Sequence, residues 1–454
     1  MTTLSDRKPS AAEQATLFDL PPANLPVPAA TAGVGRPRLR QANRDQIVDR
    51  ALPLNALLPA DHAARTIWAY VQGLDLSTLH DAIGSVRGGS GHAATDPRVL
   101  LALWLYATSD GVGSARRLDR LCRDHVAYQW IAGGVTMNYH TLADFRTDHV
   151  ELLDGLLTRS IATLMAEGLI DLNRVARDGM RVRASAGAAS SRRRPTPDEA
   201  SAQAEAQVEA LRAEAEGDPA AADRRRKAAR ERAARDQAGR IKSALARLPE
   251  LEAKKVAHEK DKARCSTTDP EATVMKTADG GFRPAYHAQF ATTVDGLAVV
   301  GVDVIASGSD AGQMAPMVEQ VRDRSGVTPS EMPADGGFAQ HDQIDAVSAP
   351  GVGCTVYAPV PRPRDPKMDR YVPKPDDSPA VAARRARMAT AEAKEIYKGR
   401  AATAECVNAL ARGRGLLRFV VRGLARVRAV ALWHAVTRNV MRMATPRAAS
   451  AAKA

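Results

Sequence analysis

The chain has 454 residues, of which 44% are hydrophobic and only 4% aromatic. This length allows two or three domains, whose cores must be built mainly from Ala, Val and Leu. An excess of 64 Lys+Arg over 52 Asp+Glu gives a formal net charge of +12, which suits a polyanionic partner but does not require one. The four cysteines form no C-x-x-C pair, so neither a zinc site nor a disulfide framework is expected. The N-terminus does not resemble a signal peptide and no run of about 18 apolar residues occurs, so the sequence predicts a cytoplasmic protein without a membrane span.

Both ends of the chain are expected to be disordered. Residues 1–45 are rich in Pro, Ala and polar residues and are predicted to form a basic tail. Within it, Arg36 and Arg38 flank a proline, which is typical of short arms that enter a narrow minor groove of DNA. A plain basic tail is the simpler interpretation. Residues 444–454 are predicted to form a second disordered tail.

Residues 46–170 are predicted to form a helical N-terminal domain. Asp96 can cap a helix that has Pro97 in its first turn, and the apolar run Val99–Ala107 predicts that this helix is buried. A later helix carries four basic residues that share one face, namely Arg116, Arg117, Arg120 and Arg123. Such a face is typical of a helix lying on DNA, although a solvated helix surface explains the pattern almost as well.

Residues 171–443 are predicted to form a second domain around a mixed sheet. The predicted strands lie at residues 174–185, 286–294, 297–305, 331–334 and 354–360. Asp295-Gly296 indicates a tight hairpin between the second and third of them. Helices are expected at 310–323 and from 380 to 443, with an interruption near Gly413. Together with the helical N-terminal domain, this order predicts a mixed α+β or α/β fold.

Residues 196–262 interrupt this second domain. They are dominated by Ala, Glu, Arg and Lys and contain no aromatic residue. This composition predicts a long helical insertion, similar to a coiled coil, that turns back on itself at residues 217–219. Its charges are expected to form mainly a solvated surface.

Two carboxylates stand out by their position. Asp178 and Asp335 each follow a strand and precede a glycine, and open mixed sheets bind ligands near such strand ends. Glu405 lies in a predicted helix with apolar neighbours, where an unpaired charge would be costly. Carboxylates of this kind suit hard divalent cations. Spacing alone does not select these three from the other acids, because Asp279, Asp303 and Asp310 compete on composition.

Several segments, in their order along the chain, resemble the DDE transposases of bacterial insertion sequences, in particular the group numbered eleven eighty-two. The segments are RPRLRQANRDQIVDRALPLNALLPADHAAR, NYHTLADFR, RVARDGMRVRASA, STTDPEATVMKTADGGFRPAYHAQ, ADGGF and IYKGRAATAECVNALARGRGL. The resemblance covers about residues 36–180 and 265–443.

The resemblance implies an RNase H-like catalytic core. In it Asp178 and Asp335 lie on neighbouring strands, Glu405 faces them from a helix, and the three bind Mg²⁺ or Mn²⁺, as two ions. Tyr397 and Arg400 take the places that the family gives to a Tyr and an Arg before its Glu. Arg400 is expected near Glu405 or a DNA phosphate, or else paired with a nearby acid, and Tyr397 is expected to pack or to contact phosphate. The family has a Lys seven positions after the Glu. Here Arg412 stands instead, and an arginine can also hold a phosphate.

The activity that the resemblance implies is metal-dependent hydrolysis of a phosphodiester at each transposon end, followed by transfer of the freed 3′-hydroxyl to target DNA. The expected partners are the terminal inverted repeats, bound by the helical domain and the basic tail, and the target DNA. A homodimer on DNA, in the bacterial cytoplasm and associated with the nucleoid, is expected from this mechanism. Two alternatives remain: a catalytically inactive DNA-binding protein derived from such an element, and a helical scaffold built on residues 196–262.

Overall fold

The computed structural model describes residues 52–85, 93–193 and 221–443, together with residues 199, 201–206 and 208–209. The predicted tails and the arginines Arg36 and Arg38 lie outside these residues. Within the described part, no helix is long and apolar enough to cross a membrane. The four cysteines are free thiols.

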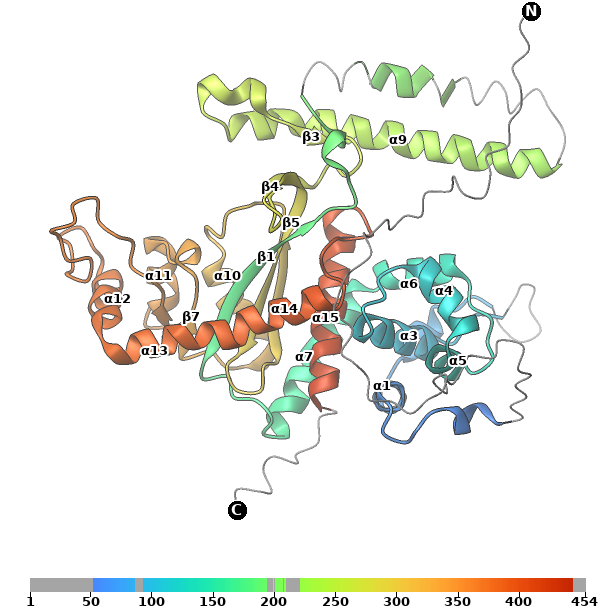
Figure 1. The fold of residues 1–454 in the computed structure, drawn as a ribbon, viewed down its shortest axis with the longest axis horizontal. Helices are drawn as coiled ribbons and strands as arrows, with labels where there is room; N and C mark the ends of the chain where they lie inside the picture. Colours follow the sequence, from blue (N-terminus) through green and yellow to red (C-terminus); the bar gives the residue numbers. More distant parts are fainter. Residues whose placement is uncertain are drawn as a thin grey trace, which may run out of the picture. The chain divides into compact units, whose positions relative to one another are not determined.

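The first part of the described chain is helical, as predicted (Figure 1). Its elements are η1 (Leu54–Leu57), α1 (Ala63–Gln72), α2 (Ser77–Asp81), α3 (Pro97–Ser109), α4 (Ala115–Asp124), α5 (Val126–Ala132), α6 (Tyr139–Thr147) and α7 (Val150–Ala166). The predicted start of α3 is confirmed, because the Asp96 side chain accepts a hydrogen bond from the Arg98 N–H and Pro97 opens the helix. All of α3 except Arg98 and Ser109 is buried, as its apolar run predicts.

The strands that follow form a mixed sheet. The strands are β1 (Val175–Arg183), β4 (Thr273–Lys276), β5 (Phe282–Thr293), β6 (Val299–Ile305), β7 (Glu331–Pro333) and β8 (Thr355–Tyr357). β5 pairs antiparallel with β1, β4 and β6. β7 and β8 pair in parallel, and two parallel bridges, Arg174 with Glu331 and Arg177 with Ala334, join β7 to β1. The bridges therefore join the two-stranded parallel sheet β7-β8 to the β1 edge of the four-stranded antiparallel sheet, in which β5 carries both β4 and β6.

Two short strands, β2 (Ser191–Arg192) and β3 (Cys265–Ser266), pair antiparallel with each other. The remaining elements are helical: η2 (Ala188–Ser190), α9 (Ala221–Ala253), η3 (Ala257–Lys262), α10 (Met314–Ser325), η4 (Gly336–Phe338), α11 (His341–Ser348), α12 (Pro379–Ala389), α13 (Ala391–Arg400), η5 (Ala401–Glu405), α14 (Cys406–Gly413) and α15 (Leu424–Met443). The predicted interruption near Gly413 is confirmed, since α14 ends there. The mixed helix and sheet content agrees with the predicted fold class.

The hairpin between β5 and β6 has a longer loop than the sequence predicts. Five residues, Val294–Ala298, separate the two strands, and Leu297 takes a positive φ of 53°. Gly296, at φ 78°, packs so closely that a Cβ there would lie 2.4 Å from the Leu169 carbonyl oxygen. The loop is therefore shaped by its contact with the end of α7 as well as by the local turn signal.

The predicted insertion contains one long helix, α9, of 33 residues. Ala244 and Leu248 of this helix pack against Ala263 and Cys265, and the Arg247 side chain donates hydrogen bonds to the Pro270 carbonyl and to Thr273 Oγ1. The predicted reversal at residues 217–219 lies outside the described residues, so the hairpin remains a prediction.

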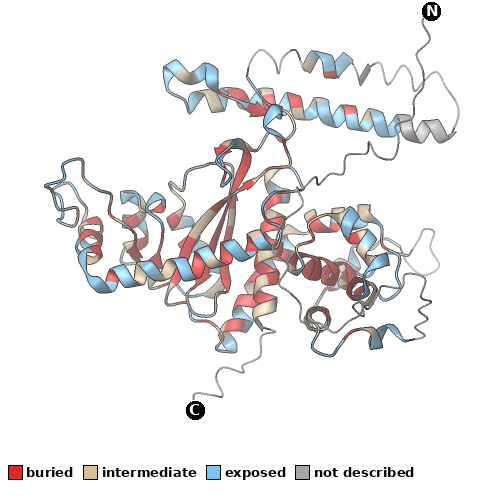
Figure 2. Ribbon diagram, viewed as in Figure 1, coloured by how far each residue is buried: buried red, intermediate tan, exposed pale blue. Residues whose placement is uncertain are grey.

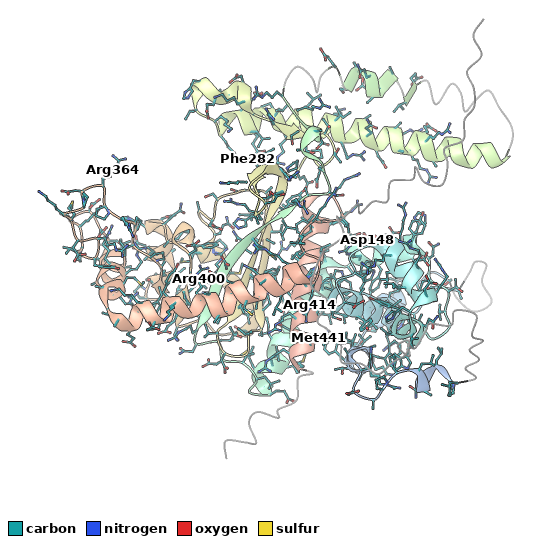
Figure 3. All side chains as sticks on the ribbon, in the orientation of Figure 1. Asp148, Phe282, Arg364, Arg400, Arg414 and Met441 are labelled. Atoms are coloured by element: carbon teal, nitrogen blue, oxygen red, sulfur yellow. The ribbon has the colours of Figure 1, made fainter. Side chains whose placement is uncertain are left out.

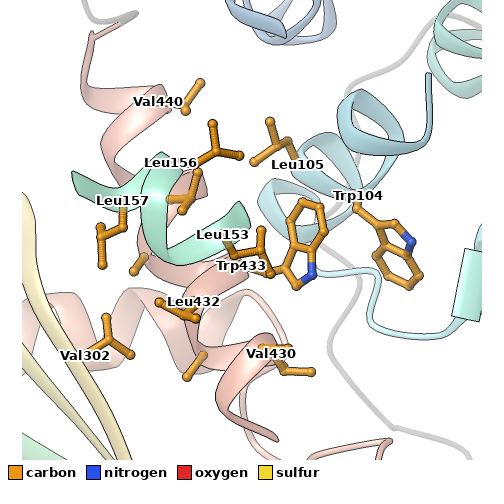
Figure 4. Close-up of a cluster of buried hydrophobic side chains, with 14 of the residues drawn as sticks. Trp104, Leu105, Leu153, Leu156, Leu157, Val302, Val430, Leu432, Trp433 and Val440 are labelled. Carbon is orange, nitrogen blue, oxygen red and sulfur yellow. The ribbon is translucent and has the colours of Figure 1, made fainter. Parts of the chain in front are cut away.

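α15 lies at the centre of the largest core cluster (Figures 2 and 4). It packs against α7, β6 and α3, and Trp433, which it carries, approaches Trp104 of α3 with ring centroids 6.4 Å apart. The Trp433 Nε1–H donates a hydrogen bond to the Arg146 carbonyl, at 2.9 Å. One core therefore joins the N-terminal helices to the sheet.

Candidate active site

Asp178 and Asp335 occupy equivalent positions on the two adjoining parallel strands. The bridge between Arg177 and Ala334 immediately precedes both of them. In each case the Oδ1 accepts a hydrogen bond from the next residue's N–H, Gly179 at 2.9 Å and Gly336 at 2.7 Å. Asp335 is exposed at the start of η4, whereas Asp178 is half-buried within β1. The strand-end position predicted for Asp335 is therefore observed, while Asp178 lies inside its strand.

Gly179 is required by close packing on the opposite strand. A Cβ at this position would lie 2.3 Å from His287 Nε2 of β5, far inside any normal contact. His287 is buried, and burial, reinforced by Arg181 and Arg177, lowers its pKa to about 4. The imidazole beside Asp178 is thus neutral at physiological pH.

Glu405 reaches the same region through a distortion of its helix. Residues Ala401–Glu405 form a π-helical turn between α13 and α14. In a regular α-helix, residues five apart point about 140° away from each other. The π turn instead lets Arg400 Nη2 donate to Glu405 Oε1 at 2.7 Å. Such turns occur frequently at functional sites.

Arg400, which is labelled in Figure 3, links Asp178 and Glu405. Its Nη1 lies 3.3 Å from Asp178 Oδ1, and its side chain is only 11% exposed. Burial disfavours the guanidinium charge, yet the charges of Asp178, Tyr397, Asp335 and Glu405 outweigh burial and raise the pKa of Arg400. The negative charges of all three predicted catalytic carboxylates therefore stabilise the charged form of one guanidinium, that of Arg400.

Glu405 was expected in apolar surroundings, where a metal or a basic partner would offset its charge. The side chain is instead 49% exposed, so the expected surroundings were wrong. The basic partner is Arg400, because the π turn brings Glu405 to the face that carries this arginine.

Asn408 of α14 supports Asp178 from the other side. Its Nδ2 donates to Asp178 Oδ2 at 3.0 Å, which lowers the pKa of Asp178, although burial is the larger influence and leaves that pKa raised. Asn408 itself is buried, and its Oδ1 has no hydrogen-bond partner among the described residues. Sequence reasoning missed Asn408. Its spacing of three from Glu405, which places both on one side of a helix, was the available signal.

A fourth carboxylate, Asp310, lies next to the loop of Asp335. A Cβ on Gly337 would be 3.0 Å from Asp310 Oδ2. Burial raises the pKa of Asp310, and the charge of Asp335 raises it further. Asp310 Oδ1 also lies 3.5 Å from His287 Nδ1 and accepts from Gln289 Nε2 at 3.3 Å. Asp310 is held on the buried side of the site.

The possible ligand atoms of the site fit a hard divalent cation, because they are carboxylate oxygens and the amide oxygen of Asn408. Among the described residues, however, no three His, Cys, Asp or Glu side chains converge closely enough to share a metal ion. Asp178 and Glu405 instead share the Arg400 guanidinium. Arg400 would have to turn aside for these oxygens to hold a metal together.

The other predicted DNA-binding residues are dispersed. The Tyr397 ring packs beneath the Arg400 guanidinium, 5.6 Å from ring centroid to Cζ. Arg412 is half-buried in the last turn of α14. Arg116, Arg117 and Arg120 are exposed on α4, opposite the buried Leu118. The structure brings Tyr397 and Arg400 together with the carboxylates, and it places the α4 arginines on a different part of the chain.

Comparison with known families adds one finding. Residues 52–148, which run from η1 through α6, match the family described as Transposase domain (DUF772). No curated protein matches the chain, and no solved structure matches it. The matched segment contains α4 with its basic face and ends before β1, so it does not include any of the three carboxylates. The match points to a transposase family and to a transposase-related function for this chain.

Proposed function

We propose that this chain is a DNA transposase of the DDE type, with an RNase H-like core, that cleaves the ends of an insertion sequence and transfers them to target DNA. The transposase domain match supports the general function. The catalytic part of the proposal rests mainly on one observation. Asp178 and Asp335 follow the same bridge between two parallel strands, and Glu405 is tied to Asp178 through Arg400.

The roles of the side chains follow from their positions. Asp178, Asp335 and Glu405 would hold Mg²⁺ or Mn²⁺, which when bound supplies activation of the attacking hydroxyl and neutralises charge on the phosphate. Asn408 fixes the orientation of Asp178 by its hydrogen bond. His287, neutral and buried, fills the space behind Gly179 without adding charge.

Arg400 has two roles in this proposal. Without metal it balances the carboxylates, which would otherwise repel one another at close range. Once displaced from them, its planar guanidinium is suited to a DNA phosphate. Tyr397 then limits its movement from below.

The test is a strand-cleavage assay on DNA that carries the element's ends, with Mg²⁺ and with EDTA. Asp178→Asn and Asp335→Asn are expected to abolish cleavage while DNA binding persists, and Glu405→Gln is expected to do the same. Asp279→Asn is the matched control, because Asp279 is an exposed partner of Arg283 in a turn. Cleavage by Asp178→Asn at the unmodified rate would refute the proposed centre.

A catalytically inactive DNA-binding protein is the second candidate. It is favoured by the position of Arg400 between two of the carboxylates and by the absence of a three-ligand cluster in the described residues. Tight binding of the unmodified protein to element ends, without cleavage in Mg²⁺ or Mn²⁺, would establish this alternative.

A further inference from the structure

A cavity lined by cations lies away from the carboxylates. Its volume is about 180 Å³, several times the volume of a water molecule, which is about 30 Å³. Its lining includes Gly113, Ser114, Arg146, Arg414, Arg418 and His434. No Asp or Glu is among the described residues that line it.

Arg146 is the buried base of this cavity. It is 7% exposed, and its Nε has no hydrogen-bond partner among the described residues. Its Nη1 donates to the Gly113 carbonyl, and its guanidinium lies 4.8 Å from the Trp104 ring centroid. Burial lowers the pKa of Arg146 to about 10, and no carboxylate opposes this effect. A buried arginine without an anionic partner is costly unless an anion arrives.

Arg414 adds a second uncompensated charge. Burial lowers its pKa, again with no carboxylate acting on it. Burial lowers the pKa of His434, and the positive charges of Arg146 and Arg414 lower it further, to about 3. His434 therefore contributes a neutral imidazole that can donate or accept a hydrogen bond.

The walls of the cavity are held by tight backbone packing. Gly111, at φ 71°, packs against the Arg414 backbone. At Gly415, whose φ is 90°, a Cβ atom would lie 3.2 Å from the Gly111 carbonyl oxygen. Ser114 caps the ten-residue helix α4, whose first amide groups begin at this wall. Free amides at a helix start favour an anion. The site is therefore preformed.

A second cavity of about 250 Å³ adjoins this one. It shares Ser114, Arg146 and Val420 with the first and adds Arg116. The Arg116 guanidinium lies 5.0 Å from the Tyr139 ring centroid. No acidic side chain is among the described residues that line this cavity either. The basic lining therefore continues to the exposed face of α4.

We infer that the cavity at Arg146 and Arg414 binds a phosphate group. Arg146 and Arg414 would supply the charge, and the start of α4 would supply amide donors. Because Arg414 directly follows α14 while Arg146 and Ser114 belong to the segment that matches the transposase domain, a bound phosphate would connect that segment to the helix next to Glu405. Where the phosphate belongs to a DNA strand, this inference rests on the proposed function and extends it.

The first measurement uses inorganic phosphate and thermal unfolding of the full chain. Phosphate is expected to raise the Tm of the unmodified protein. Arg414→Gln is expected to raise the Tm in phosphate-free buffer, because it removes an uncompensated charge, and to abolish the further rise with phosphate. Arg322→Gln is the control, because Arg322 of α10 is half-exposed and pairs with Glu319 and Asp323, and it is expected to retain the response.

The second measurement asks whether the phosphate comes from DNA. Duplex binding is measured by fluorescence anisotropy without metal, across a range of salt concentrations. Loss of one phosphate contact lowers the slope of log affinity against log salt by about 0.9. That change in Arg414→Gln, and not in Arg322→Gln, would assign a DNA phosphate. Loss of the phosphate response with an unchanged slope would assign free phosphate.

The inference is overturned if Arg414→Gln changes neither the phosphate response nor the DNA slope. Both readouts are equilibrium measurements made without cleavage, so they are independent of the proposed catalytic centre. A chain that cleaves DNA but shows no effect of Arg414→Gln would retain the proposed function and lose this inference.

Discussion

The Nη2 of Arg400 lies 2.7 Å from Glu405 Oε1 although the two residues are five apart in sequence. The π-helical turn Ala401–Glu405 makes this pairing possible, and the other terminal nitrogen of Arg400 faces Asp178 at 3.3 Å. The local helix distortion thus decides which carboxylates face each other across the site. Arg400 is therefore the residue whose removal most directly tests the organisation of the centre.

Arg400→Gln is expected to lower stability in metal-free buffer and to increase the stabilisation by Mg²⁺. Without the guanidinium, Asp178, Asp335 and Glu405 repel one another, and the cost is about 1–3 kcal/mol for a lost charged hydrogen bond. A cation that binds only the folded chain raises its Tm, and it no longer competes with Arg400. Thermal unfolding with and without Mg²⁺ measures both effects. An equal Mg²⁺ effect in the unmodified protein and in Arg400→Gln would argue against these carboxylates as a shared metal site.

Asn408→Leu is expected to shift the acidic limb of the cleavage rate to higher pH. The amide of Asn408 donates to Asp178, and this bond lowers the pKa of a carboxyl that burial has already raised. Without it the pKa of Asp178 rises further, so the ionised form appears only at higher pH. A pH–rate profile measures the shift. Asn173→Leu, at an exposed position before β1, serves as the control, and an identical profile for Asn408→Leu would contradict the positioning role.

Gly179→Ala is expected to destabilise the fold by about 1–3 kcal/mol, the usual cost of overpacking. The new Cβ would lie 2.3 Å from His287 Nε2. His287→Ala in the same chain should recover most of this loss, since it removes the clashing ring. Denaturant unfolding of the two single variants and the double variant gives the coupling.

Gly155→Ala is the matched control for that cycle. No heavy atom lies within 4 Å of a Cβ at this exposed position in α7. The substitution should stabilise the helix by about 0.5–1 kcal/mol. Strictly additive effects of Gly179→Ala and His287→Ala would show that the two residues do not press on each other.

The sequence alone predicted the parts of the fold that depend on local patterns. The cap and proline of α3 and the strand β1 both appear where they were expected. The loop after Thr293 was wrong in length because it is shaped by Leu169, a residue more than 100 positions earlier in the chain, which no local turn signal reports.

The candidate site also contains some features that the sequence predicted and others that depend on distant residues. The strand-and-glycine context singled out Asp178 and Asp335, and the family resemblance implied that they lie on neighbouring strands, with which the bridge between Arg177 and Ala334 agrees. Neither the π turn nor the approach of Asn408 and Asp310 was predicted. The π turn packs against β1 and β5, and the contacts of Asn408 and Asp310 depend on which distant strands and helices meet. The cavity at Arg146 and Arg414 joins residues 268 positions apart in sequence, so spacing carried no sign of it.

His287→Gln is expected to flatten the dependence of stability on pH below neutrality. The pKa of about 4 in the folded chain lies below the ordinary value of about 6.5 in an unfolded chain. The unfolded chain therefore binds the proton more tightly, and stability is lost as the pH falls from about 6.5 towards 4, by at most about 1.4 kcal/mol per pH unit. Asp310 changes stability with pH in the opposite direction, because burial raises its pKa. This contribution is present in every variant compared. Urea unfolding at several pH values measures the slope, with the exposed His258→Gln as control. If His287→Gln and the unmodified protein lost stability equally over this range, the buried imidazole beside Gly179 would not be held neutral by the fold.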